Sequence, residues 1–433
     1  MAKSEADDVY SHSRRELLWA APAGLLLLIL VFGPYLFTNS LIYSGDFGSS
    51  YLLELNIPRR VLAAQALRSG ELPLWEPKLS NGLPLLAEGQ AAVFNPFSVS
   101  AYLLLPPTLA TNICTIITLF IAWIGMYGLI RTFGLHPLAA FMGAVAYSLG
   151  GVFLFHLHHL NLSHSIAYLP LLLALLRGYA HSLRYKRSAK PWLIGLGAVL
   201  VLQILTGHPH MTYLSWMAAA IFVISSLWGE NRCAFEANLD SEASDPPEQR
   251  RNSLQIIVTA CGQLLAVGIV SLLLCSVQLL PTFELSQLSS RSQPYTWEAL
   301  KDSPFTLKDL RYLVQPYCFG NPAEGTYQRT NLNQGVFWEN NAYIGFIPLA
   351  LALLTLIDCR QRHISWLWSL AIFFLGAAFG PQGYIYWIFW KLCPGFNLFR
   401  CPSRFLFVFS LILTLLSAFG CQRLLQMYQL NQH

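Results

Sequence analysis

The chain has 433 residues, of which 55% are hydrophobic and 11% are charged, and its net charge is +5. Soluble domains carry about 25% charged residues, so this composition excludes an ordinary soluble protein and indicates one that spans a membrane. Basic residues beside apolar segments account for the small positive excess, which therefore gives no reason to expect nucleic acid as a partner.

Long apolar segments recur along the whole chain. A helix needs roughly 20 apolar residues to cross the hydrocarbon of a bilayer. About ten segments approach that length, which predicts an all-α polytopic membrane protein with a single transmembrane domain over residues 1–433. The predicted spans cover about 17–38, 108–131, 137–155, 163–180, 191–206, 209–228, 254–280, 341–358, 364–380 and 403–423. A shorter apolar segment at 93–105 is expected to dip into the membrane without crossing.

Basic residues orient this predicted bundle, because lysine and arginine are retained on the cytoplasmic side. The N-terminal flank and the loops 177–190 and 229–253 contain such residues, whereas the short turn 156–163 contains none. We therefore expect a cytoplasmic N-terminus and a polar cytoplasmic linker at 229–253. Two long loops, 39–107 and 281–340, then face outward.

The first outer loop opens with a lone acidic residue, Asp46. An amphipathic interfacial helix is expected over 50–69, bent or broken by Pro58, and a run rich in Pro and Gly surrounds Trp75. The expected apolar face comprises Leu52, Leu55, Val61, Leu62 and Ala66, and the expected polar face comprises Glu54, Arg59, Arg60 and Arg68. An ionisable residue near the hydrocarbon is costly, which favours a function for Asp46 over a structural plug.

Two histidine-rich turns follow on the same predicted outer side. Residues 156–164 form the sequence HLHHLNLSH, and residues 207–213 form GHPHMTY, in which Pro209 breaks a helix. Imidazoles gathered at one surface can bind a metal or phosphate, or move protons. The alternative is a set of interfacial histidines that satisfy their own hydrogen bonds, and the sequence leaves both open.

The last outer segments contain both signs of charge. Glu339 follows Trp338, and Arg400 and Arg404 lie in GFNLFRCPSRF just before the last span. Two arginines four residues apart can share a helical face and meet an anionic headgroup. The alternative is ordinary anchoring by snorkelling side chains, which the outward location disfavours.

Several enzyme classes lack their motifs. The sequence contains no H-E-x-x-H, no G-x-x-x-x-G-K-[ST] and no G-x-S-x-G, so it does not indicate a membrane metalloprotease, a P-loop NTPase or a serine hydrolase of those types.

Four blocks in one order resemble a known family. GELPLWEP, GHPHMTYLSW, ENNAYIGFIPL and PGFNLFRCPSRF are similar to blocks of the YfhO-type bacterial membrane proteins, which belong with the GT-C glycosyltransferases. The resemblance covers most of the chain, from Asp46 to the last span. It implies a GT-C-like bundle in the bacterial plasma membrane. It also implies transfer of a sugar from a polyprenyl-phosphate carrier to an envelope polymer or lipid acceptor on the outer face.

The resemblance implies roles for single residues. Asp46 matches the acidic residue of the first outer loop, which acts as general base or metal ligand in this superfamily. The donor phosphate is then stabilised either by a divalent cation, Mg²⁺ or Mn²⁺, near Asp46 and His159, or by Arg400 and Arg404. The candidate substrate-binding residues are Arg59, Trp75, Glu88, Gln90, His159, His208, Glu339, Arg400 and Arg404.

Two other classes of function remain alternatives. A flippase or transporter of lipid-linked precursors would need ionisable residues deep within several spans, where this sequence has few. A non-catalytic scaffold is the other, because family members are usually longer and a protein partner would then supply what this chain lacks.

Overall fold

The computed structural model describes residues 2–44, 50–184, 187–240, 247–289, 292–302, 305–328 and 336–430. This part of the chain is helical and contains no strand beyond one isolated bridge between Glu76 and Leu83. The longer helices are α1 (Ala2–Leu36), α2 (Ile57–Arg68), α4 (Pro96–Leu104), α5 (Pro107–Arg131), α6 (Pro137–Ser148), α8 (Leu160–Ala167), α9 (Leu169–Arg184), α10 (Lys190–Ile204), α11 (Pro209–Asp240), α12 (Pro247–Leu274), α13 (Ser276–Leu288), α15 (Phe346–Leu354), α16 (Arg362–Ala378), α17 (Tyr384–Leu392) and α18 (Phe405–Leu430). Shorter helical turns lie at Leu52–Asn56, Leu85–Glu88 (α3), Gly151–Leu154 (α7), Ala299–Asp302, Leu307–Leu313, Pro322–Glu324, Phe337–Asn340 (α14), Thr355–Asp358, Gly380–Gln382, Phe396–Leu398 and Pro402–Arg404.

Fewer segments than expected have the length and composition of a membrane span. Within the described ranges there are five: Glu16–Leu36, Pro107–Arg131, Pro137–Leu154, Leu160–Leu183 and Pro402–Leu430. A sixth exists if α12 and α13 form one span, although they are bent by 76° at their junction. The all-helical, multi-pass prediction is thus confirmed, but the number of ten spans is not. Helices Lys190–Ile204 and Phe346–Asp358 are apolar but too short to cross a bilayer unaided.

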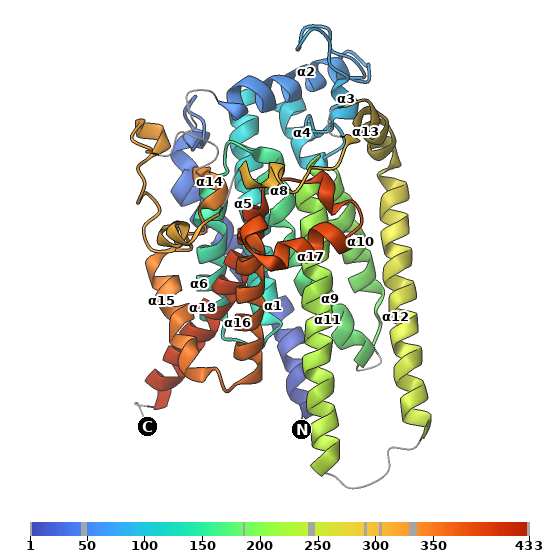
Figure 1. Ribbon diagram of the computed structural model, residues 1–433, viewed down its shortest axis with the longest axis vertical. Helices are drawn as coiled ribbons and strands as arrows, with labels where there is room; N and C mark the ends of the chain where they lie inside the picture. The colour runs from blue at the N-terminus through green and yellow to red at the C-terminus, as the bar shows by residue number, and fades with distance from the viewer. Residues whose placement is uncertain are drawn as a thin grey trace.

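Helix α18 forms the centre of the bundle and packs against α6, α15 and α16, while α5 packs against α1, α6 and α9 (Figure 1). Small residues permit the closest of these contacts. A side chain at Gly420 of α18 would overlap the carbonyl oxygen of Leu351 in α15, and one at Gly125 of α5 would overlap the backbone of Leu171 in α9. Such approach between helices is typical of packing inside a membrane.

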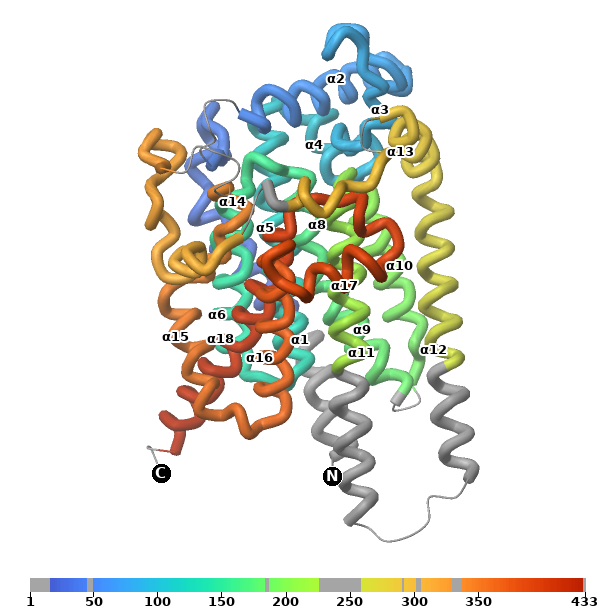
Figure 2. The backbone as a smooth tube through the Cα atoms, in the orientation of Figure 1, coloured from blue at the N-terminus to red at the C-terminus, as the bar shows by residue number. Residues whose placement is uncertain are grey.

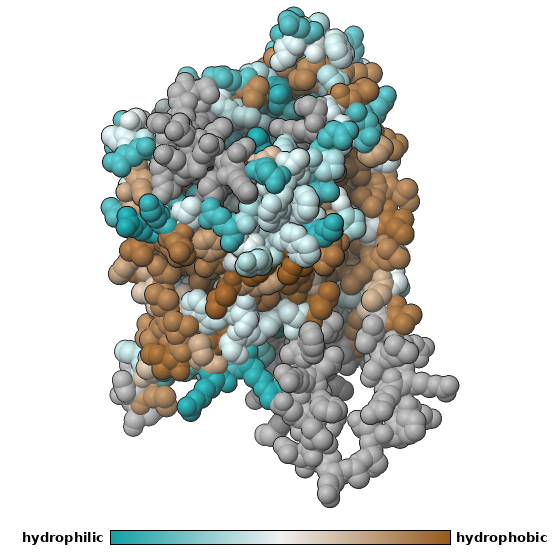
Figure 3. All heavy atoms as spheres, viewed as in Figure 1, coloured by the Kyte–Doolittle hydropathy of each residue, from teal (hydrophilic) through white to brown (hydrophobic). Residues whose placement is uncertain are grey.

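The first outer loop forms its own layer at one end of the molecule. Helices α2, α3 and α4 lie at the end opposite both termini, and α13 lies beside α3 (Figures 1 and 2). On the face drawn in Figure 3, hydrophobic residues gather across the middle and along the α12 edge, and hydrophilic residues lie toward both ends. This band of hydropathy is what a bilayer requires of a spanning protein.

Helix α2 differs from its prediction in two ways. Pro58 does not break the helix: it lies in the first turn of α2, and helical backbone continues into it from Asn56. A π-helical turn, Leu52–Asn56, leads directly into it. The buried face also contains polar residues, namely Asn56 and Arg60, beside the apolar Ala63 and Ala64. Arg60 was expected on the polar face.

Two further segments test the expected loops. The predicted linker 229–253 is largely helical, because α11 continues through Asp240 and α12 begins at Pro247, and its remaining residues lie outside the described part. The predicted dipping segment is α4, which has nine residues and is too short to cross. Arg68 donates from its guanidinium to the carbonyl oxygens of Tyr102 and Leu103 at the C-terminal end of α4.

Candidate functional site at the outer end of the bundle

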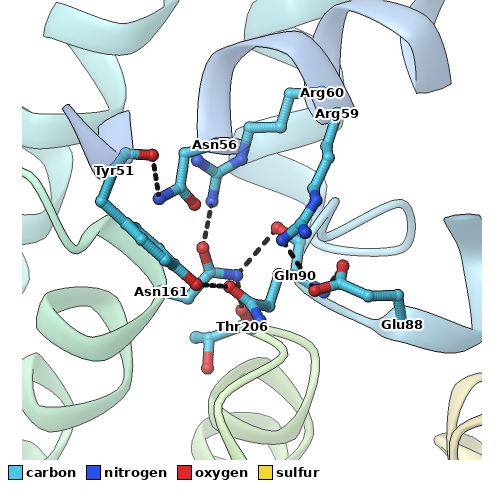
Figure 4. Close-up of polar contacts among 8 residues, drawn as sticks. All are labelled: Tyr51, Asn56, Arg59, Arg60, Glu88, Gln90, Asn161 and Thr206. Atoms are coloured by element: carbon cyan, nitrogen blue, oxygen red, sulfur yellow. Dashed lines mark hydrogen bonds and ion pairs between the residues drawn. The ribbon is translucent and has the colours of Figure 1, made fainter. Parts of the chain in front are cut away.

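Asn161 of α8 joins three segments that are distant in sequence (Figure 4). Its Nδ2 donates to the backbone oxygens of Gln90 and Thr206, at 2.9 and 2.6 Å. Its Oδ1 accepts a hydrogen bond from Arg60 Nη2 at 3.0 Å. The side chain is buried, so these bonds replace water and fix the first outer loop against α8 and the turn between α10 and α11.

Two glycines allow the loop and that turn to touch. Gly89 and Gly207 have φ values of +81° and +74°, in the left-handed region that favours glycine. A Cβ at Gly207 would overlap the carbonyl oxygen of Gly89. The predicted break in GHPH therefore serves to bring the loop down onto the bundle.

Three of the predicted substrate-binding residues lie together beside Asn161. Arg59 Nη1 and Glu88 Oε1 form an ion pair at 2.8 Å, with side chains that are 13% and 12% exposed. Glu88 Oε2 accepts from the backbone N–H of Gln90 at 3.0 Å, and Gln90 Oε1 accepts from the hydroxyl of Tyr51 at 2.6 Å. We refer to Tyr51, Arg59, Arg60, Glu88, Gln90 and Asn161 as the loop network.

Arg60 is one of three members of the loop network, with Tyr51 and Asn161, that the sequence analysis did not propose as substrate-binding residues. It is 2% exposed, and its Nε and Nη1 have no hydrogen-bond partner. The signal was present in its spacing, since positions 52, 56 and 60 recur every four residues and share one face of the helix. Charge alone had assigned it to the opposite face.

The first histidine-rich segment, residues 156–164, lies next to the loop network, and we refer to it as the histidine turn. The rings of His158 and His159 are 4.1 Å apart, and Trp338 lies 4.6 Å from His158. Ser44 Oγ is 2.9 Å from His158 Nδ1, and the Tyr51 ring is 4.9 Å from that of His159. Residues 45–49, including Asp46, lie outside the described part, but the described chain on each side of them contacts this turn.

Burial keeps two histidines of the turn neutral. It lowers the pKa of His156 to about 3, although Glu339 acts in the opposite direction. Burial and the neighbouring His158 also hold the pKa of His159 well below its usual value. His156 Nε2 and His159 Nδ1 have no hydrogen-bond partner, so each can bond to a ligand or a water.

Arg404 and Glu339 form a second, buried cluster with His210. Arg404 Nη2 lies 2.7 Å from Glu339 Oε1, and its Nε lies 3.1 Å from both carboxylate oxygens. Its Nη1 is 2.8 Å from His210 Nδ1. Burial alone would raise the pKa of Glu339, but the charge and hydrogen bonds of Arg404 outweigh it and lower that pKa.

The two arginines before the last span do not act as a pair. Cys401 between them has a φ of +66°, and only Pro402–Arg404 forms a helical turn, so Arg400 and Arg404 share no helical face. Arg400 is exposed, whereas Arg404 is occupied by Glu339. The predicted joint binding of one phosphate does not fit this geometry.

The remaining candidates lie in different surroundings. Trp75 is 61% exposed in the loop beyond α2, where its ring packs against Gly82 rather than against the loop network. His208 ends the α10–α11 turn, and its Nδ1 accepts from the backbone N–H of Met211 at 3.2 Å. Its ring is 6.5 Å from that of His210, so it lies near the buried cluster.

A metal site is not assembled by the described residues. No three of their His, Cys, Asp or Glu side chains are grouped so that they could hold a metal ion. Asp46 lies outside this part of the chain, so a cation between Asp46 and His159 stays a prediction. His159 itself contacts other rings.

No family model, curated protein or solved structure matches the chain. The resemblance to YfhO-type proteins therefore stays a prediction.

Proposed function

We propose that the protein is a membrane glycosyltransferase of the GT-C type. It takes a sugar from a polyprenyl-phosphate carrier and transfers it to an envelope polymer or lipid on the outer face of a bacterial plasma membrane, with its N-terminus in the cytoplasm. The observation that supports this proposal most is the histidine turn. Ser44 and Tyr51, which flank Asp46 in the sequence, contact the buried imidazoles of His158 and His159 there.

The chemistry needs one base and one anion-stabilising group. The acceptor hydroxyl oxygen attacks the anomeric carbon, its proton passes to the Asp46 carboxylate, and the bond to the phosphate oxygen breaks. The polyprenyl phosphate leaves with the bonding electrons, and direct displacement inverts the anomeric centre. Arg404 is neutralised by Glu339, so we assign it to holding the bundle beneath the turn, and the exposed Arg400 to the phosphate.

The positions of the buried charges favour an enzyme that acts at the membrane surface over a transporter that moves lipid-linked precursors across the membrane. Glu16 and Arg131 pair with each other at one end of their spans, and Arg404 is the third residue of its own span. A transporter would instead be expected to carry ionisable groups near the middle of several spans.

The deciding experiment is transfer by the purified full chain, with labelled polyprenyl-phosphate sugars and an envelope acceptor. Asp46→Asn should lower the transfer rate by about 10²-fold or more, because general-base catalysis contributes that much. Glu54→Gln is the matched control, since Glu54 is an exposed acid of the same loop, and it should leave transfer unchanged. Transfer retained by Asp46→Asn, with unchanged circular dichroism in both variants, would contradict the assignment.

A further inference from the structure

Helix α17 exposes an apolar face that no part of the described chain covers. Tyr384 and Leu392 are 94% and 69% exposed, and between them Trp387 and Ile388 are 48% and 43% exposed. These positions follow steps of three and four residues, so they share one side of the helix. Lys391, the one charged residue in the sequence of this helix, is exposed on the same side. A contiguous apolar surface of this kind marks a contact with a membrane or another molecule rather than with water.

The opposite side of α17 is fixed against the bundle. Tyr386 and Phe389 are buried, and their ring centres lie 6.1 and 5.0 Å from that of Phe405 at the start of α18. The ring of Phe389 also lies 5.6 Å from that of Phe373 in α16. Because aromatic contacts to two helices hold α17 in one orientation, its exposed side cannot turn inward.

Helix α17 lies at the outer end of the bundle. It belongs to the connection between α16, which ends at Ala378, and α18, which begins at Phe405. The rings of Phe374 and Phe405 are 6.1 Å apart, so the two helix ends that α17 connects lie at the same level. Figure 1 shows α17 running across the bundle rather than along it, over a length of about 14 Å for its nine residues. It therefore lies parallel to the membrane surface.

The apolar surface of the bundle continues onto α17. Ile372 of α16 is 65% exposed, and it precedes Phe373, which packs against Phe389 of α17. The hydrophobic band in Figure 3 crosses the same face of the molecule on which Figure 1 shows α17. Tryptophan and tyrosine favour the edge of such a band, since their rings are apolar while their N–H and O–H groups stay hydrated. A lysine there can extend its ammonium group to the headgroups.

We propose that α17 is an interfacial helix whose exposed face binds the lipid surface of the outer leaflet. Tyr384 and Trp387 lie at the level of the headgroups and glycerol, and Ile388 and Leu392 contact the beginning of the acyl chains. Lipid is the occupant because the face continues the surface that the spans present to the bilayer. The contact requires no sugar and no transfer, so it is independent of the proposed function.

Photo-crosslinking of the full chain in phospholipid nanodiscs tests this contact. Trp387→p-benzoylphenylalanine places a photoreactive ketone on the exposed face, and on irradiation it joins to a nearby C–H group. Mass spectrometry should find lipid adducts at position 387, on acyl carbons close to the glycerol. Leu72→p-benzoylphenylalanine is the matched control, because Leu72 is an apolar residue, 57% exposed, in the loop that follows α2, beyond the hydrophobic band. Lipid adducts should be absent at position 72.

A second variant keeps the test independent of the folding of the first. Tyr384→p-benzoylphenylalanine changes the most exposed side chain of α17 and should also form lipid adducts. Absence of lipid adducts at both 384 and 387, or an equal yield at 72, would overturn the proposal. Adducts to a second protein chain in place of lipid would assign the face to a protein partner and overturn it as well. Adducts confined to the methyl ends of the acyl chains would place α17 inside the hydrocarbon and contradict the interfacial location.

Discussion

The ion pair between Glu339 and Arg404 gives the sharpest test of how the outer end is held together. Glu339→Gln removes the negative charge but keeps the shape of the side chain. Glu339 is 7% exposed and forms its contacts with two guanidinium nitrogens, so the substitution leaves a buried cation facing an amide. The side chains of Glu339 and Arg404 are only 7% and 16% exposed, so water can replace little of the lost charge.

The expected magnitude follows from burial and geometry. Removing one partner of a buried pair costs about 3–5 kcal/mol, largely as the penalty of the charge left behind. The glutamine oxygen can still accept one of the hydrogen bonds, and His210 still contacts Arg404 Nη1. We therefore expect the free energy of unfolding to fall by about 3 kcal/mol, near the lower end of that range. The double variant Glu339→Gln, Arg404→Gln should be less destabilised than the sum of the two single variants, because it leaves no unpaired charge.

Unfolding by SDS can be followed by fluorescence, since the chain contains 12 tryptophans. Asp358→Asn is the matched control, because its pair with Arg423 joins side chains that are 23% and 28% exposed. That substitution should cost less than about 1 kcal/mol. If Glu339→Gln cost no more than Asp358→Asn, or if the double variant were as unstable as the sum of its parts, the pair would not stabilise the fold as we argue.

Two further predictions concern pH and the close contact beside the loop network. In the folded protein the pKa of His156 is about 3, whereas in the unfolded chain this histidine binds a proton near pH 6.5. The free energy of unfolding is therefore at its full value above pH 6.5 and falls as the pH drops toward 3. The slope approaches about 1.4 kcal/mol per pH unit, and His156→Gln should reduce it in SDS titrations between pH 8 and 5; an unchanged slope would contradict the assignment. Gly207→Ala should lower the free energy of unfolding more than Gly134→Ala does. The two glycines have similar φ values, +74° and +73°, but only a Cβ at Gly207 would overlap Gly89, whereas nothing lies within 4 Å of a Cβ at Gly134. Equal unfolding free energies for the two alanine variants would show that the contact contributes nothing beyond backbone strain of about 1 kcal/mol.

Several properties followed from the sequence because they depend on nearby residues. Apolar length predicted a helical membrane protein, and the spans Pro107–Arg131 and Pro402–Leu430 match the predicted 108–131 and 403–423 closely. Glycine and proline marked the turn at Gly207 and Pro209, because their backbone limits are intrinsic. The clustering of Arg59, Glu88 and Gln90 was anticipated only as a set of candidates, without their bonds.

The tertiary structure decided which charges are buried and what each one meets. Arg60 bonds to Asn161, 101 residues away, and Arg404 bonds to Glu339, 65 residues away, and no local pattern encodes such distances. It also decided that α12 and α13 bend by 76° instead of forming one straight span, and that a helix as short as α10 packs within the bundle. The physical reason is that hydropathy measures what a segment prefers as solvent, whereas burial of a charge depends on the partners that the whole fold brings to it.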